Sequence, residues 1–285
     1  MYGTGSSVSG NGSKIAGIFG TKGVEAASNA PPTTYFPVMW SDKQGSLWVF
    51  GGADITGVLN TLWRYRKSTG YWTWMGGAAG DGGSAVFGAS GEESASYTPP
   101  AVSGPGFAAD ESGYIWLFGG NGTYLQNGLW RYNISSGKWA WMSCTKEATG
   151  IIGYVAGASG EEASGNCPGV KSGSAMWYDK HGYLWVFGGT GYNTSNTQGY
   201  MNDLWRYNIA TNKWAWISGS PGSITIGSTF GTQGYILKTN VGGARVNSMS
   251  WYDGTYAYLF GGYGAETSSS IGYFNTLQRT KLYTN

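Results

Sequence analysis

The tripeptide Phe50-Gly51-Gly52 returns three times, as Phe118-Gly119-Gly120, Phe187-Gly188-Gly189 and Phe260-Gly261-Gly262. Successive copies begin 68, 69 and 73 residues apart. A second motif follows each copy, at Leu62-Trp63-Arg64-Tyr65, Leu129-Trp130-Arg131-Tyr132 and Leu204-Trp205-Arg206-Tyr207, and in weaker form at Leu277-Gln278-Arg279-Thr280. Self-similarity at a fixed period indicates a repeat architecture. The 285 residues are therefore predicted to be one domain of four repeats, at about residues 1–74, 75–141, 142–216 and 217–285.

Each repeat is expected to form four antiparallel strands. The first strand holds Trp40 or its counterparts, the second ends at Phe-Gly-Gly, and the third holds Leu-Trp-Arg-Tyr. The fourth carries a Trp-x-Trp pair, at Trp72/Trp74, Trp139/Trp141 and Trp214/Trp216, and the last repeat lacks this outer strand. Apolar residues on both faces of the middle strands indicate sheets that are covered on both sides. The prediction is an all-β chain, a β-propeller built of four-stranded antiparallel blades.

A Gly-Gly pair followed by Tyr and Trp seven residues apart resembles the kelch motif. The Tyr and Trp pairs are Tyr65/Trp72, Tyr132/Trp139 and Tyr207/Trp214. The resemblance covers nearly the whole chain and implies a kelch-repeat β-propeller, although kelch propellers usually have more than four blades. Kelch repeats also build the propeller of galactose oxidase, whose copper site needs two histidines and a Cys–Tyr crosslink. His181 is the single histidine here, so the resemblance implies the scaffold without that site.

Both ends of the chain fall in the same phase of the repeat, just after and just before a Trp-x-Trp strand. Three hypotheses follow. The chain is an arc of a larger propeller with Met1 as an internal residue, or it is a closed four-bladed ring. Alternatively, it is an open unit whose missing strand comes from a neighbouring molecule, which would produce filaments.

Composition excludes several classes of function. The net charge is +2, from 17 basic and 15 acidic residues, so no basic surface is expected for a nucleic acid. Apolar runs such as Leu47-Trp48-Val49-Phe50 are too short to span a bilayer, which argues against membrane insertion. A single His and two Cys leave no pattern for a metal or other cofactor.

Antiparallel order places the tight turns at one end of each sheet and the long connections at the other. Long connections on a rigid scaffold commonly carry binding residues. The candidate contact residues on them are Tyr124, Tyr192, Tyr200, Tyr263 and Tyr273. The alternative is that these tyrosines only pack their own loops.

Four Asn-x-Ser/Thr sequons, all expected outside strands, are candidate glycosylation sites: Asn11, Asn121, Asn133 and Asn193. Cys144 and Cys167 both lie in the third of the connections that lead from a fourth strand to a first strand, at positions where no other repeat has a cysteine. We expect a local disulfide, which is typical of an oxidising compartment. Two unpaired buried thiols are the alternative.

Charged residues also recur once per repeat, which favours a structural role. Arg64, Arg131, Arg206 and Arg279 form one column, and each is expected to pair with an acid or with loop carbonyls. Asp42, Asp110, Asp179 and Asp253 begin the tight turns. A Gly-x-x-Gly motif also recurs, at Gly20/Gly23, Gly88/Gly91, Gly157/Gly160 and Gly231/Gly234. The first three copies are followed by acids, which are Glu25, Glu92, Glu93, Glu161 and Glu162.

The sequence therefore predicts no catalysis. The first functional hypothesis is an extracellular or cell-surface structural module, a subunit of a fibre or surface layer that contacts neighbouring subunits. The alternative is a monomeric domain that recognises a glycan or a protein through the long connections.

Overall fold

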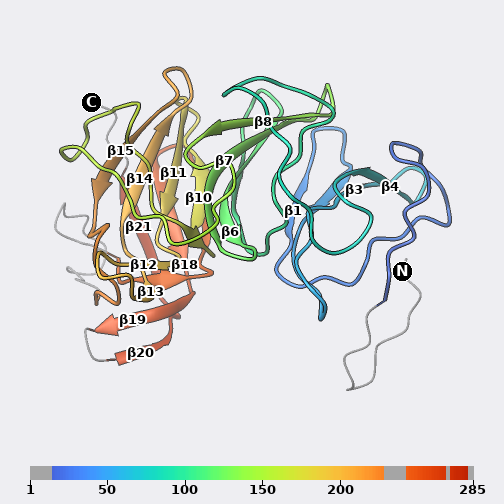
Figure 1. Ribbon diagram of the computed structural model, residues 1–285. Helices are drawn as coiled ribbons and strands as arrows, with labels where there is room; N and C mark the ends of the chain where they lie inside the picture. The colour runs from blue at the N-terminus through green and yellow to red at the C-terminus, as the bar shows by residue number, and fades with distance from the viewer. Residues whose placement is uncertain (1–14, 228–241, 268–269, 282–285) are drawn as a thin grey trace. The chain divides into compact units, whose positions relative to one another are not determined.

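The computed structural model describes residues 15–227, 242–267 and 270–281 (Figure 1). Every regular element among them is a β-strand, which confirms the all-β prediction. The chain divides into two compact units, one comprising residues up to 104 together with 130–141, the other comprising 105–129 and 142 onward. Each unit is described by itself.

The first repeat forms one antiparallel sheet in the order β1-β2-β3-β4. Its strands are β1 (Val38–Ser41), β2 (Leu47–Phe50), β3 (Leu62–Arg66) and β4 (Tyr71–Gly76). Phe50 lies opposite Val38 on one side and Leu62 on the other. Trp48, Val49 and Phe50 are all buried, and since adjacent side chains of a strand point to opposite faces, both faces of β2 are covered.

The second and third repeats also form four-stranded sheets, with strand orders β5-β6-β7-β8 and β10-β11-β14-β15. The described residues of the fourth repeat form a three-stranded sheet, β17-β18-β21. The strands are β5 (Gly106–Ala109), β6 (Tyr114–Asn121), β7 (Leu125–Asn133), β8 (Lys138–Ser143), β10 (Ala175–Tyr178), β11 (Tyr183–Phe187), β14 (Leu204–Asn208), β15 (Lys213–Ser218), β17 (Met249–Tyr252), β18 (Tyr256–Phe260) and β21 (Leu277–Lys281).

In three of the four repeats, the connection between the second and third strands is not the long loop that the sequence suggested, whereas in the first repeat residues 51–61 between β2 and β3 contain no strand. In the second repeat, β6 and β7 extend until three residues separate them, and in the later repeats the connection folds into a hairpin. These hairpins complete two small sheets, in the orders β13-β12-β9 and β16-β19-β20. Their strands are β9 (Lys171–Ser172), β12 (Thr190–Tyr192), β13 (Gln198–Tyr200), β16 (Arg245–Val246), β19 (Tyr263–Thr267) and β20 (Ser270–Tyr273). Strand pairing satisfies backbone groups that an irregular segment against the sheet would leave open.

Within each unit, the Tyr and Trp of one repeat cover the aromatic residues of the repeat before it. Tyr132 lies 5.7 Å from Trp48 between ring centroids, and Trp139 lies 5.4 Å from Phe50. The second unit repeats this packing, with Tyr207 against Trp116 at 6.0 Å and Trp214 against Phe118 at 5.4 Å. Such pairs contribute about 1 kcal/mol each beyond the burial of their area.

The Gly-Gly pair lets the backbone of the next repeat approach closely. Gly51 has a φ of +65°, and a Cβ there would lie 2.6 Å from the Val102 carbonyl oxygen. That oxygen accepts a hydrogen bond of 2.9 Å from the amide of Gly52. The second unit shows the same arrangement, with the Gly189 amide 2.8 Å from the Arg245 carbonyl oxygen. A side chain at the first glycine would therefore separate two repeats.

The Gly-x-x-Gly motif protects the outer edge of each four-stranded sheet. The amides of Gly23, Gly91 and Gly160 donate to the carbonyl oxygens of Trp74, Trp141 and Trp216, each at 2.8 Å. The connection that precedes a repeat thus runs along the fourth strand of that same repeat. Covering an edge in this way prevents it from pairing with another chain. Gly231/Gly234 lie outside the described residues.

Candidate interaction site

The turn aspartates hold their hairpins by the same three hydrogen bonds in three repeats. Asp42 Oδ1 accepts from the amides of Gln44 and Ser46, at 3.0 and 2.8 Å, and its Oδ2 accepts from Trp48 Nε1 at 2.8 Å. Asp110 and Asp179 make the equivalent contacts. The carboxylate therefore ties the turn to the tryptophan at the centre of the sheet.

The fourth repeat has a shorter turn and a different donor. The hydroxyl of Tyr258 donates to Asp253 Oδ2 at 2.8 Å, where the other repeats have an indole. The backbone amide of Tyr256, the Tyr258 hydroxyl and the amide of Thr255 together lower the pKa of Asp253. Hydrogen bonds to the ionised form have this effect.

The recurring arginines and glutamates also meet within their own repeats. Arg131 donates to Glu93 at 2.9 Å and Arg206 donates to Glu162 at 3.2 Å. In the first repeat, Glu25 pairs instead with Arg66, at 3.2 Å. Each pair joins the third strand to the segment that covers the fourth strand.

The remaining arginines of the column lie over aromatic rings of the second strand. Arg64 lies 5.8 Å from the Trp48 ring centroid, and Arg279 lies 5.0 Å from that of Tyr256. The neighbouring acids Glu92 and Glu161 accept from the amides of Ala89 and Ala158, at 3.0 Å each. These charged groups thus make contacts that support the sheets.

Three of the five candidate tyrosines form one cluster. They lie on the hairpins β12–β13 and β19–β20 of the third and fourth repeats, whose strands Figure 1 labels. Tyr263 and Tyr273 lie opposite each other on β19 and β20, with ring centroids 4.8 Å apart. Tyr200 of β13 packs edge-on against Tyr263 at 5.6 Å. Tyr273 is 89% exposed and presents its phenol ring to solvent, while Tyr200 and Tyr263 are half-buried. We call these three residues the tyrosine cluster.

The tyrosine cluster combines phenol hydroxyl groups with apolar rings. Partial burial of Tyr200, with smaller contributions from Tyr263 and Tyr273, raises the pKa of the Tyr200 phenol. Each hydroxyl can therefore donate and accept a hydrogen bond while the ring offers apolar area. This combination suits contact with a protein or a sugar more than chemistry on a substrate.

The other two candidate tyrosines lie elsewhere. Tyr124 is exposed at the tip between β6 and β7. Tyr192 packs against a small buried cluster formed by Leu125, Ala148 and Val170. Tyr192 thus belongs to the local core.

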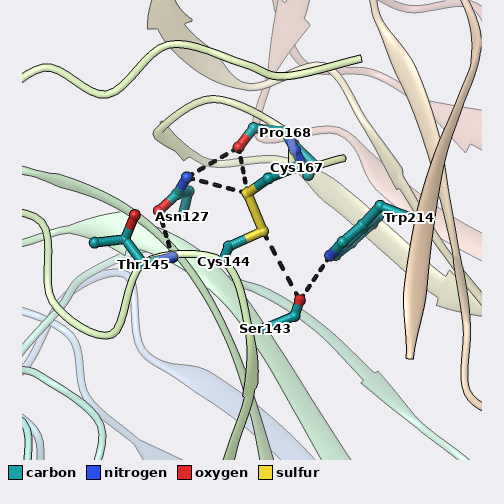
Figure 2. Close-up of a disulfide and its surroundings, with 7 residues drawn as sticks. All are labelled: Asn127, Ser143, Cys144, Thr145, Cys167, Pro168 and Trp214. Carbon is teal, nitrogen blue, oxygen red and sulfur yellow. Dashed lines mark hydrogen bonds between the residues drawn. A yellow bond between two sulfur atoms is a disulfide. The ribbon is translucent and has the colours of Figure 1, made fainter. Parts of the chain in front are cut away.

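The predicted disulfide between Cys144 and Cys167 is present, with 5.7 Å between their Cα atoms (Figure 2). Cys144 directly follows β8, and Cys167 lies four residues before β9. The bond therefore ties together the two ends of the connection between the second and third repeats. Cys144 has a φ of +65°, a backbone conformation that favours glycine. The corresponding positions of the first and third repeats do hold glycine, Gly77 and Gly219, with a positive φ.

An asparagine column that the sequence analysis did not single out fastens the same connections. Asn127 Nδ2 donates to the Pro168 carbonyl oxygen at 3.0 Å, and its Oδ1 accepts from the Thr145 amide at 3.4 Å (Figure 2). Asn60 does the same with Pro99 and Ala78, at 3.1 and 2.8 Å. The signal was available, because an Asn stands two residues before each Leu-Trp-Arg-Tyr motif.

The sequons differ in what their side chains do. Asn121 and Asn133 end strands β6 and β7, so the expectation that all sequons lie outside strands was wrong. Asn133 Nδ2 donates to Glu93 at 3.1 Å, a contact that a glycan on this nitrogen would displace. Asn193 lies in the β12–β13 turn, where its Oδ1 accepts two backbone amides. Asn11 lies outside the described residues.

Two further observations apply to the described residues alone. They contain no group of three His, Cys, Asp or Glu side chains placed to hold a metal ion. No helix among them is long and apolar enough to cross a bilayer. His181 is exposed in its turn, where its backbone amide bonds to Asp179.

No family model matches the chain. It is similar to Kelch domain-containing protein 10 of Rattus norvegicus, with 27% identity over 236 aligned positions that cover 66% of this chain and 51% of that protein. The protein of the same description from Mus musculus is also 27% identical, with 48% of its length covered. The chain thus spans about half the length of the curated relatives it matches. Together with the four Phe-Gly-Gly repeats and their antiparallel sheets, this similarity supports the prediction that the chain is built of kelch repeats.

Proposed function

We propose that this chain is a non-catalytic, extracellular interaction module that binds a protein partner through the tyrosine cluster. The observation that carries the proposal is the contact of Tyr200, Tyr263 and Tyr273 across two hairpins. Tyrosine is enriched in protein interfaces, since a rigid ring with a hydroxyl gives both apolar area and hydrogen bonding.

The scaffold in this proposal is a β-propeller whose four sheets are the blades, either a closed ring or an arc of a larger propeller. Support comes from the repeated packing of Tyr and Trp on the preceding repeat. In a propeller, packing of this kind would join neighbouring blades flank to flank. The hairpins that carry the tyrosine cluster would then project from one end of the blades.

A non-catalytic role is supported by the engagement of the recurring charged groups. Glu93 and Glu162 bind arginines, and Asp179 binds two amides and an indole. A screen of the purified protein for glycosidase, esterase and oxidase activity tests this role. Turnover that disappears when acids near the hairpins are substituted would contradict it.

An extracellular location is supported by the disulfide between Cys144 and Cys167, because disulfides persist in oxidising compartments. Glycosylation of Asn193 is part of the same proposal. Mass spectrometry of the native protein tests both features together. A reduced thiol pair and unmodified sequons would argue for a different compartment.

Photo-crosslinking tests the partner class. A crosslinker at position 273 should capture a protein from the native extracellular material, and Tyr263→Ala should abolish this capture. A crosslinker at exposed position 124 is the matched control and should capture much less. Equal capture from both positions would contradict the proposal. Binding on a glycan array that is lost in Tyr263→Ala would indicate that the partner is a carbohydrate and not a protein.

A second candidate function is a structural subunit of a fibre or surface layer. The observation that favours it is the exposed apolar face of the fourth repeat, which includes Met249 and Leu277. Electron microscopy of the native material tests it, and isolated single copies would contradict it.

A further inference from the structure

The third repeat contains a buried ion pair whose two positions recur in the fourth repeat. Lys171 is 2% exposed, and its ammonium nitrogen lies 2.5 and 2.6 Å from the two carboxylate oxygens of Asp203. The indole of Trp205 donates to the same carboxylate at 2.7 Å. The Asp203 carboxylate thus joins one charged donor to one neutral donor.

Strand register shows which residue of the fourth repeat corresponds to Lys171. Lys171 pairs with Gly191, and Arg245 pairs with Gly264. In both repeats this glycine is the second residue after Phe-Gly-Gly. Arg245 therefore stands at the position of Lys171, and the cation is kept.

The position of the acid is identified in the same way. Asp203 directly precedes β14, and its carbonyl oxygen accepts from the Gly188 amide at 3.1 Å. Thr276 directly precedes β21, and its carbonyl oxygen accepts from the Gly261 amide at 3.3 Å. The fourth repeat thus has a threonine where the third repeat has the counter-ion.

Arg245 is 1% exposed, yet its guanidinium group contacts only neutral groups among the described residues. Nε donates to the Gly243 carbonyl oxygen at 3.1 Å, Nη1 donates to that of Gly261 at 3.4 Å, and the group lies 3.9 Å from the Phe274 ring centroid. Nη2 has no partner in that part of the chain. Burial lowers the pKa of Arg245 to about 10, so the group is still charged at neutral pH. The residues outside the described ranges include no Asp or Glu.

Two neighbouring side chains can donate to the same position. Thr276 Oγ1 is buried and has no partner among the described residues. Gln278 stands where the third repeat has Trp205, and its Oε1 would lie 2.8 Å from a Cβ at Gly242, beside the segment that leads to Arg245. Glutamine is much smaller than tryptophan, so it leaves room, and its NH₂ group can donate as the indole does.

The second repeat shows that these positions need no charge at all. The Val102 carbonyl oxygen lies beside Gly51 as the Arg245 carbonyl oxygen lies beside Gly188, so Val102 stands at the position of the cation. Gly128 stands at the position of the acid. A buried cation without a counter-ion is costly, and the fourth repeat keeps one.

We propose that a small carboxylate such as acetate binds between Arg245, Thr276 and Gln278, at the position that the Asp203 side chain fills in the third repeat. Its oxygens accept from the guanidinium Nη2, from the threonine hydroxyl and from the glutamine amide. A carboxylate carries the single negative charge that Arg245 lacks and can accept several hydrogen bonds. All the residues of this site belong to one repeat and to the second unit.

Thr276→Asp tests the site by placing the carboxylate in the chain. The new aspartate should pair with Arg245 as Asp203 pairs with Lys171, so the variant should melt roughly 3 °C or more above the unsubstituted chain. Thr61→Asp is the matched control. Thr61 is buried and directly precedes β3, but the first repeat has Thr34 at the position of the cation. This control should lower the melting temperature, because its carboxylate has no cation to pair with.

Binding is measured directly with acetate. Calorimetric titration and thermal unfolding are carried out in sodium acetate and in sodium chloride, at equal ionic strength and neutral pH. Acetate should bind the unsubstituted chain and stabilise it more than chloride does. Arg245→Met should bind acetate about tenfold more weakly or worse, because hydrogen bonds to a charged group are lost. Arg245→Met should still fold, since it replaces a buried charge by an apolar side chain.

Four results would overturn the proposal. Acetate and chloride could act alike on the unsubstituted chain, or Arg245→Met could bind acetate as well as the unsubstituted chain does. Thr276→Asp could keep the full response to acetate or melt no higher than Thr61→Asp. Tighter binding of phosphate than of acetate would refute the carboxylate as the ligand class. None of these results bears on the tyrosine cluster, which shares no residue with this site.

Discussion

Replacing Asp179 by Asn should destabilise the protein far more than the same change at Asp253. Both carboxylates accept two backbone amides and one side-chain donor. They differ in burial, since Asp179 is fully buried and Asp253 is exposed, and they differ in the side-chain donor.

The side-chain donor decides the size of the effect. The amide introduced by Asp179→Asn would keep Oδ1 as an acceptor for the His181 and Tyr183 amides but would place an NH₂ group opposite Trp185 Nε1, which is 2.9 Å from the present Oδ2. An indole can only donate, so two donors would face each other in a buried site. An unsatisfied buried donor, together with weaker bonds to a neutral acceptor, costs about 2–4 kcal/mol. At position 253 the Tyr258 hydroxyl can turn and accept from the new NH₂ group, so the loss there should be much smaller.

Denaturant unfolding followed by tryptophan fluorescence measures the two free energies of unfolding. Exchange of the Trp185 indole proton, followed by NMR, reports on the local site and should accelerate in Asp179→Asn. The reasoning would be refuted if Asp179→Asn unfolded within about 0.5 kcal/mol of the unsubstituted chain, which is the range of a surface change. It would also be refuted if Asp253→Asn were the more costly of the two.

Three further predictions follow from other buried groups. Lys171 Nζ is buried and lies 2.5 and 2.6 Å from the two carboxylate oxygens of Asp203. Asp203→Asn leaves this ammonium group without a counter-ion and should lower the free energy of unfolding by about 3–5 kcal/mol. A loss below about 1 kcal/mol in urea unfolding would contradict this. Cys144→Gly with Cys167→Thr removes a bond between residues 23 apart and should lower stability by about 3 kcal/mol; reductant should then have no effect on the variant while it destabilises the parent. Burial raises the pKa of the Tyr132 phenol. Above about pH 10 the unfolded chain therefore loses a proton that the folded chain keeps, and the free energy of unfolding should fall as the pH rises. An ultraviolet titration in which every tyrosine ionises near pH 10 without unfolding would contradict this.

The repeat period, the all-β class and the identity of most strands could be predicted because they depend on local patterns. Phe-Gly-Gly marks the end of a strand in three of the four repeats, since its glycines adopt a positive φ, and Asp42 with its turn sets a hairpin that needs few distant contacts. The disulfide was also predictable, because Cys144 and Cys167 lie in one connection and have no counterparts in other repeats.

The hairpins that replace the long loops could not be predicted. Strand pairing such as Tyr263 with Tyr273 depends on the sheet that the hairpin extends, here through Arg245 and Val246 of β16. The grouping of Tyr200 with Tyr263 joins residues from different repeats, so no local pattern contains it. For the same reason the sequence did not separate Tyr192, which packs inward, from the exposed Tyr273.

The sequence by itself determined the repeating unit, because residue order fixes which backbone angles and which alternation of side chains are available within a few residues of each other. Only the tertiary structure decided which tyrosines meet and which of them packs inward. Those outcomes depend on contacts between residues that are far apart in the chain, where exposure is set by whatever lies on the other side of a sheet.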